Sequence, residues 1–199
     1  MCYNVLYNKG AVVKKFIIYA LFTAVLLGKE ELVIDGKKVT IYDSQIAIAK
    51  KVYAIGKNYK DKRGESFEKT LTAISLTESS LGVYLVGDIT KNRAILSCSF
   101  GVMQIQLGTA KDVINRLFPE LFPEMRKIND YVLLNKIAMD PLFSAKISAL
   151  YLTHLSNTRK SYFSTVSGYN GGFKNIKYYR KVMENMRIIK AMERKGILS

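Results

Sequence analysis

The stretch LTAISLTESSLG, residues 71–82, has the spacing of a buried helix and one charged side chain that does not fit it. The position that should continue the apolar stripe of this helix carries Glu78. A charge on the buried face of a helix costs several kcal/mol unless it is paired or takes up a proton. The pattern predicts a helix over residues 67–80, with Gly82 just beyond it as the residue that terminates the helix. Its apolar stripe consists of Phe67, Leu71, Ile74 and Leu81.

The rest of the chain also has the patterns of a mainly helical protein. A length of 199 residues, with 49% hydrophobic content and three prolines, suits one domain with a single core. Alternating apolar and polar residues predict a small hairpin over 32–43, around Asp35-Gly36, and mixed composition predicts a loop over 83–100. Helical spacing and capping residues predict further helices over 44–60 (opened by Ser44), 109–118, 130–139, 141–157, 162–170 and 175–195.

The beginning of the chain has the profile of an export signal. Lys14 and Lys15 precede the apolar run 16–27, which is shorter than the roughly 20 residues of a membrane-spanning helix. We therefore interpret residues 1–28 as a signal peptide or an N-terminal membrane anchor, and residues 1–11 as an upstream artefact. No small-residue cleavage site follows the run, so both a cleaved and a tethered form stay open, as does a buried N-terminal helix. Export predicts a location in the periplasm or cell envelope.

The net charge of +15 predicts attraction to polyanions, which include nucleic acids, anionic lipids and acidic cell-wall polymers. Export argues against nucleic acid as the partner, whereas contact with the inner membrane stays open. The basic C-terminal helix is interpreted as a solvated face or a non-specific adhesive surface. One histidine, His154, and two cysteines, Cys2 and Cys98, make neither a metal-ligand set nor a disulfide framework.

Glu78 has the features of a general acid. Apolar surroundings disfavour the ionised carboxylate and raise its pKa, and cleavage of a glycosidic bond requires a protonated acid at the leaving oxygen. The alternative is a half-exposed structural carboxylate at the end of its helix. Two other stretches carry groups suited to binding sugars: GVMQI (101–105) contains Gln104, and SGYNGG (167–172) contains Tyr169 and Asn170.

In the order ESS (78–80), GVMQI (101–105), GYNGG (168–172) and YYRKV (178–182), the sequence resembles the soluble lytic transglycosylase (SLT) domain family of the lysozyme-like superfamily. The resemblance implies a lysozyme-like α or α+β catalytic domain over residues 41–192. This sequence departs from the family pattern at Val102, Gly168 and Tyr179, and by a long insertion between Ser80 and Gly101.

The resemblance implies that Glu78 protonates the oxygen between N-acetylmuramic acid (MurNAc) and N-acetylglucosamine (GlcNAc), then acts as a base. The product would carry a 1,6-anhydroMurNAc end, and no water would be consumed. Ser79 would orient the acid or the acetamido group of the substrate, and Tyr178 would form a hydrogen bond with the Glu78 carboxyl group.

The remaining substrate-binding positions also follow from the resemblance. Met103 and Gln104 would form the floor under the cleaved sugars, and Tyr169 and Asn170 would hold the acetamido region. The implied partner is the glycan strand of peptidoglycan, and the reaction needs no cofactor or metal.

Two alternatives to a lytic transglycosylase stay open. A second carboxylate in the groove would activate water and make the protein a hydrolytic goose-type lysozyme. Asp88, in the insertion, is the nearest candidate, and Glu65 and Asp112 are more remote. The other alternative is a non-catalytic peptidoglycan-binding component of a secretion or conjugation machine.

Overall fold

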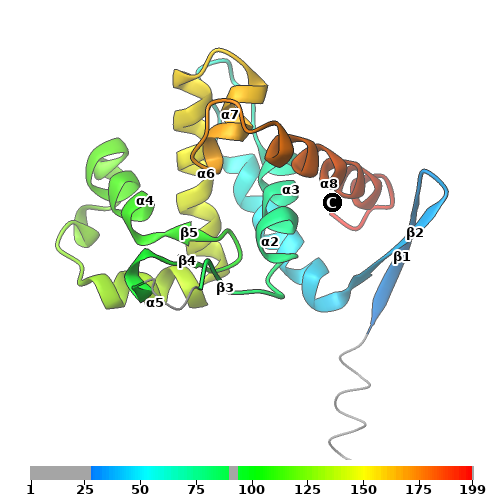
Figure 1. Ribbon diagram of the computed structural model, residues 1–199, viewed down its shortest axis with the longest axis horizontal. Coiled ribbons are helices and arrows are strands. Elements are labelled where there is room, and N and C mark those ends of the chain that lie inside the picture. Colours follow the sequence, from blue (N-terminus) through cyan, green and yellow to red (C-terminus); the bar gives the residue numbers. More distant parts are fainter. Residues whose placement is uncertain (1–27, 90–93, 199) are drawn as a thin grey trace, which may run out of the picture.

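The computed structural model describes residues 28–89 and 94–198 (Figure 1). The predicted signal peptide or anchor, and the residues interpreted as an artefact, therefore lie outside the described residues, except for Gly28. The described chain is mainly helical, which confirms the predicted fold class. Its α-helices are α2 (Asp43–Asn58), α3 (Glu68–Ser79), α4 (Leu107–Asp112), α5 (Asp130–Met139), α6 (Pro141–Thr158), α7 (Tyr162–Tyr169) and α8 (Ile176–Arg194).

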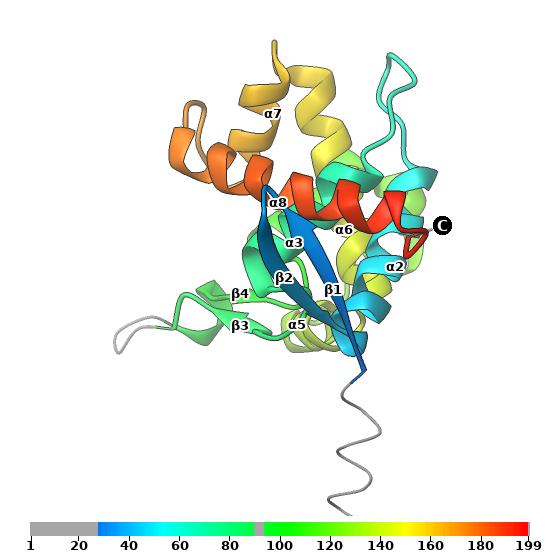
Figure 2. The same ribbon diagram turned by 90° about the vertical axis from the view of Figure 1, so that its right-hand side faces the viewer.

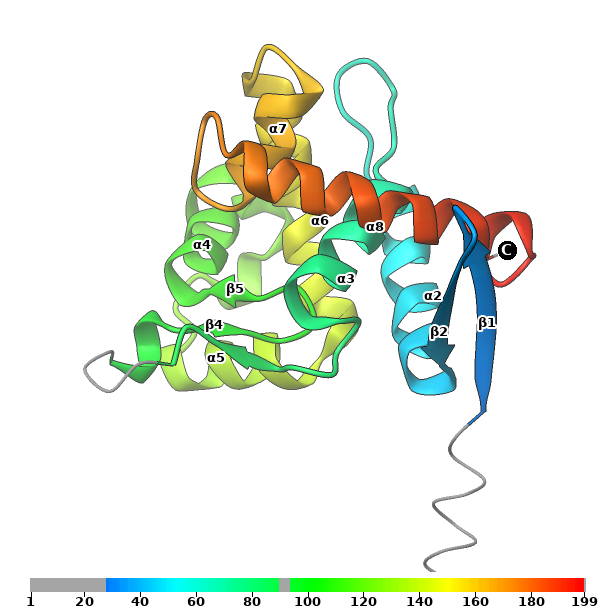
Figure 3. The same cartoon turned by 45° about the vertical axis from the view of Figure 1, so that its right-hand side comes forward.

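The predicted N-terminal hairpin is present, with strands β1 (Lys29–Ile34) and β2 (Lys37–Tyr42) paired antiparallel. Asp35 and Gly36 form its turn with φ angles of 50° and 75°, the left-handed pair that a tight two-residue hairpin needs. The hairpin packs beside α8 (Figures 2 and 3), where Arg187 lies 2.6 Å from Asp35 and Lys195 pairs with Glu30.

A small three-stranded antiparallel sheet takes two of its strands from the region that was predicted to be a loop. Its strands are β3 (Val86–Gly87), β4 (Ser99–Phe100) and β5 (Ile105–Gln106), in the order β3-β4-β5. The prediction of a loop over 83–100 was therefore wrong at both ends of the segment. Strands of two residues show no recognisable alternation in sequence, and their stability comes from pairing with one another.

Several predicted helix boundaries were also wrong. The helix predicted over 109–118 is the short α4 followed by a π-helix over Val113–Leu117. α2 begins at Asp43 rather than at Ser44, because the Gln45 side chain accepts a hydrogen bond from the Tyr42 backbone N–H at 3.0 Å and so caps the helix. α3 ends before Gly82, because Ser80 and Leu81 already have left-handed φ angles of 51° and 56°.

The core lies between α2, α3, α6 and α8. α3 packs against both α2 and α8, and α6 contacts α2, α5 and α7. The close approach of α2 and α3 requires Gly56, since a Cβ atom there would lie 2.4 Å from Glu68 Cα. This packing fixes the C-terminal end of α3, which carries Glu78. None of the helices within residues 28–89 and 94–198 is both long enough and apolar enough to cross a membrane.

Candidate active site

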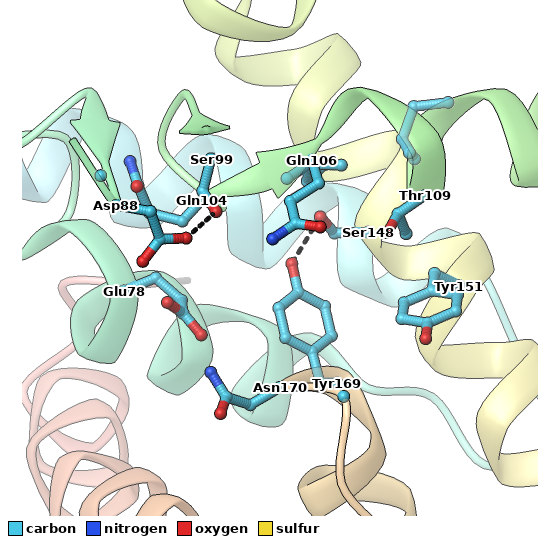
Figure 4. Close-up of a pocket in the computed structure, with 14 residues that line it drawn as sticks. Glu78, Asp88, Ser99, Gln104, Gln106, Thr109, Ser148, Tyr151, Tyr169 and Asn170 are labelled. Atoms are coloured by element: carbon cyan, nitrogen blue, oxygen red, sulfur yellow. Dashed lines mark hydrogen bonds between the residues drawn. The ribbon is translucent and has the colours of Figure 1, made fainter. Parts of the chain in front are cut away.

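A cavity of about 330 Å³ opens between the C-terminal end of α3, the sheet β3-β4-β5, α6 and the segment that follows α7. Glu78 and Asp88 lie at one end of it, and Tyr151 and Thr109 lie at the other (Figure 4). Among the sequence-predicted residues, the cavity brings together Glu78, Gln104, Tyr169, Asn170 and Asp88.

Glu78 lies in the last turn of α3, next to fully buried apolar residues of the same helix. Burial raises the pKa of its carboxyl group, and this effect outweighs the hydrogen bond from Tyr178 and the charge of Lys181, which both lower that pKa. The nearby charge of Asp88 raises it as well. The Tyr178 hydroxyl on α8 donates to Glu78 Oε1 at 2.6 Å. The raised pKa and the contact with Tyr178 agree with the sequence-based expectations, while the role of Glu78 as an acid stays a prediction.

Ser79 is fully buried and has no access to the cavity. Its hydroxyl lies 2.7 Å from the Val102 carbonyl oxygen and accepts a hydrogen bond from the Gly82 N–H at 2.8 Å. Ser75, one turn earlier, donates to the same Val102 carbonyl at 2.9 Å. Ser79 therefore holds the turn that directly follows Glu78 and does not line the cavity, where the acetamido group would bind. Its role in orienting the acid stays a prediction.

The stretch 101–105 supplies one cavity residue and one core residue. Gln104 lines the cavity, and its side-chain amide donates to the carbonyl oxygens of Gly101 (2.9 Å) and Tyr84 (3.1 Å). Gly87 makes room for this amide, since a Cβ atom there would lie 2.2 Å from Gln104 Oε1. Met103 was expected on the floor of the groove, but its side chain is fully buried in the core and does not line the cavity.

Tyr169 enters the cavity from the end of α7 (Figure 4). Its hydroxyl donates to the Met103 carbonyl oxygen at 3.0 Å, so its other neighbour, the Ser148 hydroxyl at 2.8 Å, must be the donor to Tyr169. Burial raises the pKa of Tyr169 well above its ordinary value. Asn170 follows directly, and its Oδ1 accepts a hydrogen bond from Asn175 at 3.0 Å.

Asp88 also lines the cavity, so a second carboxylate does reach the site. It has a left-handed φ of 57°, and its Oδ2 accepts a hydrogen bond from the Ser99 hydroxyl at 2.8 Å. Glu65 and Asp112 do not line the cavity, and Asp112 is paired with Arg116 at 2.6 Å.

Sequence reasoning missed several cavity residues on α6, α4 and the sheet β3-β4-β5. Ser148 and Tyr151 lie three residues apart on α6 and so share a face, which was the only signal available for them. The Tyr151 and Tyr169 rings approach to 6.0 Å between centroids, and burial raises the pKa of Tyr151. The other missed positions are Gly87, Ser99, Gln106, Thr109 and Ile147.

Within residues 28–89 and 94–198, no three His, Cys, Asp or Glu side chains lie together in an arrangement that could hold a metal ion. Cys98 is a buried free thiol whose Sγ lies 3.8 Å from the Asp88 carbonyl oxygen. His154 lies on α6 and is absent from the cavity lining.

Comparison with known proteins identifies the family. The family model described as the transglycosylase SLT domain matches residues 57–191, about two thirds of the chain. Neither a curated protein nor a solved structure matches the chain. The chain belongs to the SLT transglycosylase family of the lysozyme-like superfamily, which supports a lytic transglycosylase-type function on peptidoglycan.

Proposed function

We propose that the protein is a lytic transglycosylase that cleaves the β-1,4 bond between MurNAc and GlcNAc and leaves a 1,6-anhydroMurNAc end. The observation that carries this proposal is the carboxyl group of Glu78, which lines the cavity, has a pKa raised by burial and is held by Tyr178. Membership of the SLT family supports peptidoglycan as the substrate.

The hydrogen bond with Tyr178 determines which oxygen of Glu78 delivers the proton. Tyr178 donates to Oε1, so the proton of the neutral acid belongs on Oε2. This proton passes to the leaving oxygen of GlcNAc as the bond to the MurNAc C1 atom breaks. The carbonyl oxygen of the MurNAc acetamido group then forms a bond to C1 and takes over the positive charge as a cyclic oxazolinium ion.

The second step uses Glu78 as a base. The ionised carboxylate accepts the proton of the MurNAc C6 hydroxyl. At the same time the hydroxyl oxygen, O6, attacks C1 and displaces the acetamido oxygen. The bond from O6 to C1 closes the anhydro ring, and Glu78 regains its proton without water. Ionised Glu78 is stabilised during this interval by Tyr178 and by the positive charge of Lys181, because both favour the carboxylate.

The polar groups around Glu78 are suited to hold the reacting sugar. Tyr169 is fixed by Ser148 and by the Met103 carbonyl oxygen, so its ring keeps one position beside the acid. Gln104 and Asn170 provide amide groups on two walls of the cavity, where they can bind hydroxyl and acetamido groups.

The second candidate function is hydrolysis, and the observation that favours it is Asp88 in the same cavity as Glu78. In this reaction Asp88 would activate a water molecule for attack on C1, and the product would be a reducing end. We rank hydrolysis second because Asp88 lies in an insertion that the family pattern does not contain.

Digestion of purified peptidoglycan in H₂¹⁸O, followed by mass spectrometry, tests both reactions. Anhydro ends without ¹⁸O that disappear in Glu78→Gln support the transglycosylase, whereas reducing ends that carry ¹⁸O and disappear in Asp88→Asn support the lysozyme. Binding of peptidoglycan with no release of fragments by the unmodified protein would instead favour a non-catalytic component of a secretion or conjugation machine.

We further propose that the protein acts in the periplasm or cell envelope, since the apolar run 16–27 is typical of an export signal and the substrate lies there. Fractionation of cells and the mass of the envelope-associated protein would test this location and the cleavage of the signal.

A further inference from the structure

Arg159, at the C-terminal end of α6, holds together the segment that closes one wall of the cavity. Its guanidinium lies 3.8 Å from the centroid of the Phe173 ring, and a Cβ atom at Gly168 would lie 3.3 Å from its Cζ. Gly168 and Phe173 flank residues 169–171, which line the cavity. The guanidinium thus lies directly behind the wall that presents Tyr169 to the substrate.

One nitrogen of the partly buried Arg159 side chain lacks the partner that a buried N–H group normally has. Nη1 is buried and forms no hydrogen bond, and Arg159 forms no ion pair with any of the residues that the structure describes. Buried polar groups are paired in the great majority of cases, so an unpaired N–H indicates a missing partner. A guanidinium prefers a carboxylate or phosphate, which it binds through two parallel N–H groups.

Phe173 covers this cation only loosely. One face of its ring lies on the guanidinium, while 72% of the side chain is exposed to solvent. A contact between a cation and an exposed aromatic ring is weaker than a hydrogen bond between opposite charges, so an anion can displace the ring. Displacement is also easy sterically, because Phe173 follows Gly171 and Gly172.

The neighbourhood of Arg159 connects it to the far end of the cavity. Its positive charge acts on Tyr151, which lines the cavity opposite Glu78 (Figure 4), and on His154, one turn further along α6. The acidic group on this side, Asp112, is already paired with Arg116. Arg159 does not line the cavity itself, so an anion that arrives with the substrate reaches its guanidinium only where the Phe173 ring now covers it.

We propose that Arg159 binds a carboxylate of the stem peptide carried by MurNAc, and that Phe173 covers the guanidinium until the peptide displaces it. This inference rests on the proposed function, since it assumes that peptidoglycan enters the cavity. It assigns the Tyr151 end of the cavity to a sugar that carries an acidic peptide, and it makes the charge of the peptide a determinant of specificity.

The test compares three substrates of equal glycan length: strands with native peptides, the same strands with their carboxylates converted to amides by a carbodiimide and ammonia, and strands whose peptides have been removed by an amidase. The unmodified protein is expected to cleave native strands with a kcat/KM about tenfold above that for amidated strands, because a charged hydrogen bond is lost. Strands without peptides are expected to behave like amidated ones, although they keep the carboxylate of the muramic acid itself.

Three variants assign the effect to residues. Arg159→Gln is expected to abolish the preference for native over amidated strands, and Phe173→Ala to increase it, because the ring no longer covers the guanidinium. Arg116→Gln, which removes one positive charge on the same side of the cavity, is the matched control and is expected to keep the preference. Thermal unfolding of each variant identifies loss of structure, and if Arg159→Gln unfolds, the Phe173→Ala comparison still decides the proposal.

Equal cleavage of native and amidated strands would overturn the proposal, as would a full preference in Arg159→Gln or an unchanged or reduced one in Phe173→Ala. A high rate on strands without peptides would also overturn it, because the carboxylate would then belong to the sugar. Co-sedimentation of Glu78→Gln and Glu78→Gln/Arg159→Gln with the three substrates measures binding without cleavage. Absence of cleavage by the unmodified protein, together with a preference for native strands in binding that depends on Arg159, would refute the proposed function and leave the peptide site in place.

Discussion

Replacement of Tyr178 by phenylalanine removes the hydroxyl that lies 2.6 Å from Glu78 Oε1 and leaves the buried ring in place. The hydrogen bond favours the ionised carboxylate and so opposes the burial that raises the pKa of Glu78. A hydrogen bond to a charged group contributes about 1.5–3 kcal/mol, which changes an ionisation equilibrium about tenfold or more. Tyr178→Phe therefore raises the pKa of Glu78 further, and a larger fraction of the acid is protonated at neutral pH.

The pH profile of kcat/KM measures this change. The alkaline limb reports ionisation of the acid, so we expect it to move to higher pH in Tyr178→Phe, while kcat at the optimum falls about tenfold because the carboxyl group is no longer held in one orientation. Tyr162→Phe is the matched control, since its hydroxyl bonds to Thr70 away from the cavity. An alkaline limb that stays in place or moves to lower pH would refute the assignment of Glu78 as the acid.

Two further predictions concern stability and substrate binding. Burial raises the pKa of Asp61, but hydrogen bonds from Arg63 and other groups outweigh it and lower this pKa from 3.8 to about 2. Ionised Asp61 therefore stabilises the fold by about 2 kcal/mol at pH values above 3.8. Asp61→Asn should lose that stability at neutral pH, and its denaturation curves should converge with those of the unmodified protein as the pH falls from about 5 to about 2. An equal difference in stability at both ends of this pH range would contradict the reasoning. Glu65→Gln, at an exposed carboxylate nearby, is the control. Gly87→Ala would place a methyl group 2.2 Å from Gln104 Oε1 and shift that amide, so we expect KM to rise about tenfold with little change in unfolding temperature, whereas an unchanged KM would exclude Gln104 from substrate binding.

The helices were predictable from sequence because their apolar positions recur over two or more turns. α5 and most of α6 have the predicted bounds, and Pro141 opens α6 after Asp140, whose side chain caps the helix at 3.0 Å from the Leu142 N–H. The N-terminal hairpin was predictable for a different reason, since its turn residues, Asp35 and Gly36, are typical of a tight hairpin. The sheet β3-β4-β5 was not, because its two-residue strands depend on contacts between segments that are distant in sequence.

Some residues of the candidate site could also be predicted from the sequence, and others could not. Glu78 was identified because a charge in an apolar stripe conflicts with local periodicity, and such conflicts concentrate at functional positions. Met103 was misplaced because a motif specifies which residues lie near a site but not which of them face the cavity. Ser148 was missed because a small polar residue on a buried helix gives no signal until its partner, the Tyr169 hydroxyl, is known.

The motifs ESS and GVMQI form one structural unit in this fold. Ser75 and Ser79 on α3 both bond to the Val102 carbonyl oxygen, and the left-handed residues that follow Ser79 turn the chain away at once. Glu78 is therefore the last side chain of α3 that faces the cavity, and the motif GVMQI fixes its position relative to Gln104. The insertion begins at the same turn and returns through β3, bringing Asp88 to the acid. We therefore expect the motifs to determine the position of Glu78, and the choice between an anhydro product and hydrolysis to depend on the insertion, where the family pattern has no counterpart.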